Sequence, residues 1–193
     1  MRRIIFILIL LAAGVALAWF LVAHFNSPAT TASAPAGASS SPVLPGADST
    51  ASSKYPPRDV PAGQKEFRSD LYDFSVLYPQ DLNVKVTNEG GGASTIVFED
   101  DKTAQGFQIF IVPFAGSQIT DERFKEDEPS GVRDSLKSVT IDGATGASFF
   151  GKNDAIGDTA EVWFIRGGYL YEVTALKLDA AWLSNIMTTW KFL

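Results

Sequence analysis

Residues 159–175 of this 193-residue chain read TAEVWFIRGGYLYEVTA, the strongest strand signal in the sequence. Two runs rich in aromatic and β-branched residues, which are typical of strands, flank Gly167 and Gly168. Paired glycines readily adopt the positive φ angles of a tight hairpin turn. The sequence therefore predicts a β-hairpin whose strands are residues 159–165 and 169–175.

Both faces of this hairpin are apolar. In the first strand Val162 and Phe164 point to one side, while Trp163 and Ile165 point to the other. An antiparallel sheet with one solvated face would instead alternate apolar and polar residues, so we expect cover on both sides. Similar patterns between turn residues predict further strands over residues 74–78, 82–87, 95–98, 107–112, 138–141 and 145–150.

Two short helices complete the predicted domain. Thr120 can cap the first, with Phe124 pointing inward and Pro129 limiting its length. Asp179 can cap the second, whose apolar stripe comprises Leu183, Ile186, Met187 and Trp190. The predicted fold is α+β, an antiparallel β-sheet sandwiched between helices in an α/β/α arrangement.

Three segments together carry a resemblance to a known family. They are YDFSVLYP at residues 72–79, EVWF at residues 161–164 and IMTTWKF at residues 186–192. Over residues 67–193 the chain resembles the PsbP-like family, in a bacterial membrane-anchored version. The resemblance implies an antiparallel sheet with helices on both sides and a non-enzymatic role. Photosynthetic members assist photosystem II from the lumen, but no photosystem-contact or metal motif maps onto this sequence, so that role is not carried over.

The amino-terminal region predicts a membrane anchor. Residues 1–3 form a short basic segment, and residues 4–25 follow without an acidic or basic side chain other than His24. These 22 residues make a helix of about 33 Å, enough to cross a hydrocarbon core of about 30 Å. Because Arg2 and Arg3 precede the span, we expect the amino terminus in the cytoplasm and the remaining chain outside.

A cleaved signal peptide is the alternative, because Ala16-Leu17-Ala18 has the small-x-small form that processing requires. Apolar residues continue from Trp19 to Phe25, longer than a usual signal-peptide core, which favours an uncleaved anchor. Residues 26–66 are rich in Ala, Ser, Thr and Pro and predict a disordered linker. The globular domain is then residues 67–193.

Composition narrows the chemistry of the exported domain. The chain has no Cys and a single His, which precludes cysteine nucleophiles, thiolate metal sites and His-dependent hydrolytic triads in that domain. The net charge is −6 for the chain, and residues 67–193 hold 11 basic and 19 acidic side chains. An excess of acidic groups argues against nucleic-acid binding, and no cofactor motif is present.

Carboxylate chemistry stays open. One acidic group comprises Glu99, Asp100 and Asp101, and a second comprises Asp121, Glu122, Glu126, Asp127 and Glu128. Neither has the spacing of a dedicated calcium loop. Glu161 and Glu172, in the last hairpin, either point to solvent or line a functional surface.

The predicted function is a non-catalytic extracytoplasmic interaction module that binds an envelope or secreted protein. The alternatives are a carboxylate-dependent enzyme acting on envelope glycans, which needs two carboxyls facing across a cleft, and a calcium-tuned adhesion module. We assign no catalytic, cofactor-binding or metal-ligating residue from the sequence.

Overall fold

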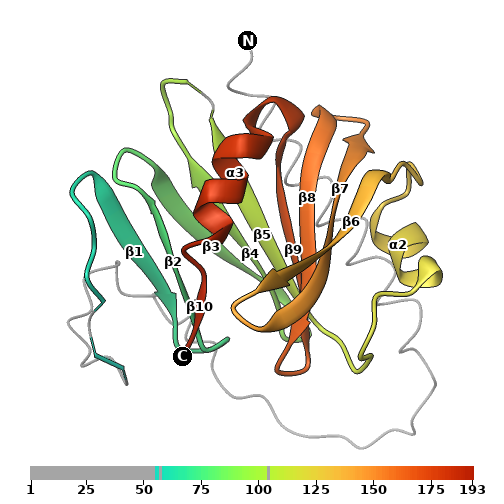
Figure 1. Ribbon diagram of the computed structural model, residues 1–193, viewed down its shortest axis with the longest axis horizontal. Helices are drawn as coiled ribbons and strands as arrows, with labels where there is room; N and C mark the ends of the chain where they lie inside the picture. The colour runs from blue at the N-terminus through green and yellow to red at the C-terminus, as the bar shows by residue number, and fades with distance from the viewer. Residues whose placement is uncertain (1–54, 57, 104) are drawn as a thin grey trace, which may run out of the picture.

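The computed structural model describes residues 55, 56, 58–103 and 105–193, which form two antiparallel sheets (Figure 1). The larger sheet has seven strands in the order β3-β4-β5-β9-β8-β7-β6. Their bounds are β3 Asn83–Gly90, β4 Ala93–Glu99, β5 Gly106–Pro113, β6 Asp134–Ile141, β7 Ala144–Asn153, β8 Gly157–Arg166 and β9 Tyr169–Leu176. The smaller sheet, in the order β1-β2-β10, comprises β1 Gln64–Ser69, β2 Phe74–Pro79 and β10 Lys191–Phe192.

Tight turns set the strand order where the sequence predicted them. Gly167 and Gly168 join β8 to β9 with φ of +61° and +83°, and Arg166 faces Tyr169 across the turn. Asp142 and Gly143 join β6 to β7 with φ of +45° and +83°. Two consecutive residues at positive φ match the twist of a two-residue hairpin, so both predicted hairpins are confirmed.

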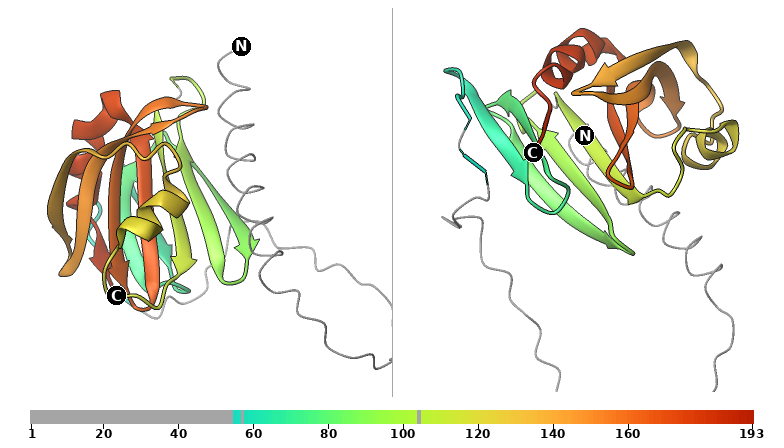
Figure 2. Two further views of the ribbon diagram at one scale, coloured as in Figure 1. Left: turned by 90° about the vertical axis from the view of Figure 1, so that its right-hand side faces the viewer. Right: turned by 60° about the horizontal axis from the view of Figure 1, so that its bottom comes forward.

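One face of the seven-stranded sheet is covered by two different elements (Figure 2). The α-helix α3, Ala180–Met187, lies beside the small sheet, and both contribute residues to the main core. The sequence predicted a helical layer here and placed residues 74–78 in the same sheet as the other strands. That expectation is corrected, because β2 pairs only with β1 and β10 and packs as a second sheet.

The main core is built from aromatic pairs. The ring of Phe74 stacks on Trp190 with centroids 4.3 Å apart, and Phe164 meets the edge of Trp190 at 5.0 Å. These three side chains come from the three segments that carry the family resemblance. The segments therefore meet in space, and their aromatic residues pack with one another.

The opposite face of the large sheet carries the α-helix α2, Asp121–Asp127. Thr120 caps it by accepting a hydrogen bond from the backbone N–H of Arg123, as the sequence predicted. Phe124, also predicted to point inward, stacks on Trp163 at 5.0 Å and meets the edge of Phe149 at 5.4 Å. With Leu170 these side chains form a second apolar cluster, so the sheet is covered on both faces.

The end of the chain differs from the prediction in one detail. The 3₁₀ helix η1, Lys177–Asp179, precedes α3, and Asp179 makes no capping hydrogen bond from its side chain. Its carboxylate accepts a hydrogen bond from Gln105 Nε2 at 3.1 Å instead. The apolar stripe is confirmed for Leu183, Ile186 and Met187, whereas Trp190, which is also buried, lies beyond the end of α3.

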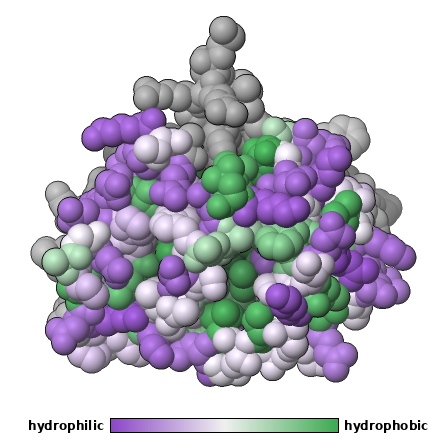
Figure 3. Space-filling model, turned by 45° about the horizontal axis from the view of Figure 1, so that its top comes forward, coloured by the Kyte–Doolittle hydropathy of each residue, from purple (hydrophilic) through white to green (hydrophobic). Residues whose placement is uncertain are grey.

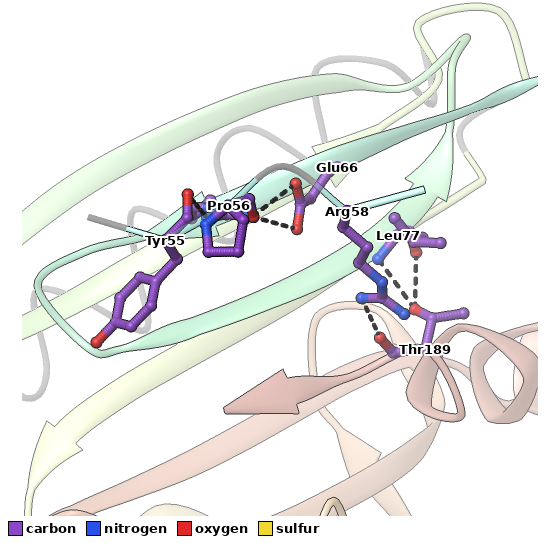
Figure 4. A network of polar contacts seen from close by, with 7 residues as sticks. Tyr55, Pro56, Arg58, Glu66, Leu77 and Thr189 are labelled. Carbon is purple, nitrogen blue, oxygen red and sulfur yellow. Dashed lines mark hydrogen bonds and ion pairs between the residues drawn. The ribbon is translucent and has the colours of Figure 1, made fainter. Parts of the chain in front are cut away.

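Ordered contacts begin before the predicted domain boundary at Phe67. Figure 4 shows Arg58, whose guanidinium donates to the Thr189 carbonyl oxygen at 2.6 Å. Arg68 donates to the carbonyl oxygens of Tyr55 and Pro56, both at 3.1 Å, and pairs with Glu66. Residues just before β1 are thus attached to the domain, although the sequence placed them in the linker.

The anchor predicted over residues 4–25, the cleavage site after Ala18 and the linker up to residue 54 lie outside the described residues. Among the residues that the structure does describe, we find no helix long and apolar enough to span a bilayer.

Candidate functional site

A cluster of buried carboxyls lies between α2 and the seven-stranded sheet. Glu161 and Glu172 come from β8 and β9, and both are on the face that α2 covers. Asp127 ends α2, and Glu128 follows it directly. Buried carboxyls normally need compensating partners, so this cluster is the candidate site.

Glu161 lies beneath α2 with 4% of its surface exposed. Its Oε2 accepts hydrogen bonds from Thr174 Oγ1 at 2.7 Å and from Trp163 Nε1 at 3.2 Å. Burial nevertheless raises the pKa of Glu161 from 4.5 to about 7, because an ionised carboxylate there would lose its hydration. Glu161 is therefore a neutral acid below that pH.

Glu172 shares its surroundings with Asp127 and Arg123. The Asp127 and Glu172 carboxyl groups are close neighbours, since Arg123 contacts both of them. Burial, and after it the neighbouring Asp127 charge, raises the pKa of Glu172 well above its ordinary value, so its neutral form is favoured. Arg123 pairs with Asp127 and lies 3.8 Å from Glu172 Oε1.

Glu128 reaches the cluster from the other side of the α2 terminus. It is 7% exposed, and Ser130 Oγ donates a hydrogen bond to it. A Cβ placed on Gly151 of β7 would lie 2.9 Å from Glu128 Oε2 and 2.8 Å from Thr159 Oγ1. The missing side chain at residue 151 makes room for the Glu128 carboxylate against the sheet.

The two acidic groups singled out from the sequence lie in different surroundings in the structure. In the first group, Asp100 accepts hydrogen bonds from the Lys102 N–H and the Thr103 hydroxyl, and the Thr103 contact is the main cause of its lowered pKa. In the second group Asp121 and Glu122 are exposed, whereas Asp127 and Glu128 turn toward the sheet. Within the described ranges, no three acidic or histidine side chains are placed to hold a metal ion.

A pocket of about 200 Å³ lies elsewhere, at the end of the sheet that carries the β8–β9 turn. Its lining combines Arg166, Asp73 and the aromatic rings of Tyr169 and Phe192. The Arg166 guanidinium lies over the Phe192 ring at 5.2 Å. None of the clustered carboxyls lines this pocket, so the two features are separate.

The sequence pattern identified only some of the residues of this site. It placed Glu161 and Glu172 on central strands but left their orientation open, and it did not single out Arg123 or Gly151. A signal was present, because a carboxyl on a strand covered on both faces must be buried. What was missing was the register, which puts Trp163 opposite Glu172 and both under α2.

Comparison with known proteins supports the fold. No protein-family model and no curated protein sequence matches the chain. The chain is similar to the solution structure of cyanobacterial PsbP from Synechocystis sp. PCC 6803, with a TM-score of 0.51 and 10% identity. The alignment covers 69% of this chain and 95% of that one. At this identity the likeness shows a PsbP-like fold, which confirms the resemblance at the level of architecture.

The cluster can hold and release protons, but its geometry does not offer them to a substrate. A pair of glycosidase carboxyls faces a bound sugar across an open cleft. Here the carboxyls face protein donors, one another and the underside of α2. Their chemistry is therefore internal to the fold.

Proposed function

We propose that this protein is a non-catalytic accessory module that binds an envelope or secreted protein outside the cytoplasmic membrane. In this proposal residues 4–25 anchor the chain in the membrane, and the following linker holds the β domain away from the lipid. The amino terminus lies in the cytoplasm and the domain on the opposite side.

One observation carries the non-catalytic part of the proposal. The two carboxyls with raised pKa are enclosed in the fold beneath α2: Glu161 accepts a hydrogen bond from Thr174, and Glu172 lies beside Asp127 and Arg123. Perturbed carboxyls are the usual mark of an acid–base site, but such a site also needs room for a substrate. The PsbP-like fold adds support, because the family that the sequence resembles is mostly non-enzymatic.

The surface supports a protein partner through its sheet edges. β3 and β6 are the two edges of the seven-stranded sheet, and each presents a large apolar side chain, Val86 at 58% and Leu136 at 51% exposure. Edge strands carry backbone donors and acceptors that a partner strand can pair with. Figure 3 shows hydrophobic residues on one face with hydrophilic residues around and between them, which suits a module that stays soluble between encounters.

Site-specific photocrosslinking in intact cells tests this proposal. A photoreactive amino acid is placed at Val86 on β3, at Leu136 on β6 or, as a matched exposed position on a helix and not on an edge strand, at Lys125 on α2. We expect one recurring protein adduct from an edge position and none from Lys125. The proposal is contradicted if all three positions give the same adducts, or if none gives any.

A further inference from the structure

The segment that carries α2, residues 114–133, is attached to the sheet mainly by side chains. Its first residue donates a backbone hydrogen bond, from Phe114 N to the Gly168 carbonyl oxygen at 2.7 Å. The remaining backbone hydrogen bonds of this segment are local, linking Thr120 to Phe124, Phe124 to Glu128 and Glu128 to Gly131. Because no strand-like row of backbone hydrogen bonds joins α2 to the sheet, its side-chain contacts determine whether it stays packed there.

Two sets of contacts hold α2 down. The first is apolar, formed by Phe124 on Trp163 and Phe149, with the Arg133 guanidinium 4.4 Å above the Phe124 ring. The second is the carboxyl cluster, in which Asp127 and Arg123 of α2 meet Glu172 of β9. Only the second set changes with protonation.

The charges beneath α2 are unbalanced once the carboxyls ionise. The facing groups are Glu161 and Glu172 from the sheet and Arg123, Asp127 and Glu128 from the segment. The neighbouring strands β5 and β7 present side chains without charge on this face, including Gln108, Phe110, Phe149 and Gly151. On the outer side Glu126 also approaches Arg123 at 3.6 Å, and Arg133 pairs with Asp121. Four carboxylates would then face a single guanidinium.

We propose that residues 114–133 form a proton-controlled cover over the sheet, which neutral Glu161 and Glu172 keep closed and which their ionisation releases. Arg123 and Asp127 bring α2 against Glu172 of β9, and ionisation of Glu172 adds a repulsion between its charge and that of Asp127 across this contact. Release uncovers the aromatic cluster around Trp163.

The direction follows from the burial of the two acids. Because burial raises the pKa of Glu161 to about 7 and that of Glu172 well above its ordinary value, the cover is closed in acid and loosens as the pH rises beyond neutrality.

Hydrogen exchange on the full-length protein in mild detergent tests this inference. The protection factors of the amides in α2, corrected for the intrinsic pH dependence of exchange, are measured at pH 5.5, 7 and 8.5. We expect protection at Phe124 and Glu128, whose amides are hydrogen-bonded, to fall about tenfold or more across this range, the population shift that about 1.4 kcal/mol produces. Ile109, in the centre of β5, should keep its protection.

Two variants test whether Glu161 and Glu172 cause the pH dependence of protection in α2. The double variant Glu161→Gln/Glu172→Gln removes both titrating groups and should show flat protection in α2. Glu122→Gln makes the same chemical change at an exposed position of α2 and should behave as the wild type. Flat protection in the wild-type protein overturns the inference whether or not the double variant folds, and an equal fall in the double variant also overturns it.

Discussion

Glu161 is the residue in which the conflict between burial and charge is clearest. Its carboxyl accepts two hydrogen bonds, yet its pKa rises to about 7, because two neutral donors do not replace the hydration of an anion. A carboxyl that binds its proton more tightly in the folded state stabilises the fold most below pH 4.5. That stabilisation is lost as the pH rises from there to about 7.

Replacing Glu161 by Gln should therefore stabilise the folded protein more and more, relative to wild type, as the pH rises. The shift from 4.5 to about 7 corresponds to about 3 kcal/mol, so the free energy of unfolding of Glu161→Gln relative to wild type should increase by up to that amount between pH 4.5 and 8. Urea unfolding at a series of pH values measures it. A difference that does not change with pH would show that Glu161 is ionised in the folded protein.

Gly151 should tolerate no side chain. A Cβ would come within 3 Å of both Glu128 Oε2 and Thr159 Oγ1, and we expect Gly151→Ala to destabilise the protein by about 1–3 kcal/mol. The loss should be smaller in a Thr159→Ala background, where one of the two obstructing atoms is gone. Thermal unfolding of the four proteins in this cycle checks it, and an Ala at position 151 without cost would contradict the described contact.

The sequence correctly predicted that Phe124 points inward from a helix, and wrongly predicted that the Asp179 side chain caps one. Phe124 followed from a local cap and helical spacing, which depend on neighbours along the chain. Asp179 has a side-chain partner 74 residues away, Gln105, and such a contact leaves no trace in local spacing.

Among the elements, the turn between β6 and β7 connects the large sheet to the small one. Asp142 has φ of +45°, and its carboxylate accepts hydrogen bonds from Phe192 N at 2.7 Å and Lys191 Nζ at 3.0 Å. The hydrogen bond from Phe192 N is the main cause of the lowered pKa of Asp142, and the contact with Lys191 lowers it further. The turn therefore depends on both an unusual backbone conformation and an acceptor.

Two substitutions of Asp142 distinguish the requirement for positive φ from the requirement for a hydrogen-bond acceptor. Asp142→Ala should cost about 1–2 kcal/mol, because Ala disfavours positive φ and accepts no hydrogen bond, whereas Asp142→Asn should cost less than half as much. Since the lowered pKa means that the carboxylate's contribution fades as the protein is acidified, the Asp142→Ala loss should shrink below pH 4. Denaturant unfolding at pH 7 and pH 3.5 provides the check. Equal costs for Ala and Asn would contradict this role.

The strands β2 through β9 were predictable, and so were the partners that tight turns join, whereas partners distant in sequence were not. The alternating pattern located β2 through β9, and the turn residues paired β6 with β7 and β8 with β9. The pairing of β2 with β1 and β10 joins residues 75 and 191, and no local signal encodes such a distant contact. For this reason the sequence pattern predicted only a helical layer where the structure has a second sheet beside α3.

At the scale of the whole molecule, the proposed topology has a direct test, because the chain contains no Cys. Lys125→Cys places one thiol on the exposed side of α2, and the same substitution at Arg3 places one before the proposed anchor. In intact cells stripped of any outer barrier, a membrane-impermeant maleimide should label residue 125 but not residue 3. Labelling of residue 125 only after lysis would contradict the extracytoplasmic domain.

Glu161 and Glu172 are enclosed in the fold beneath α2, where burial favours their neutral forms. Carbon-13 NMR titration of the glutamate side-chain carboxyls measures this directly, with Glu161→Gln assigning the signal. The Glu161 carboxyl should titrate near pH 7. Titration near pH 4.5, the ordinary value for glutamate, would contradict it.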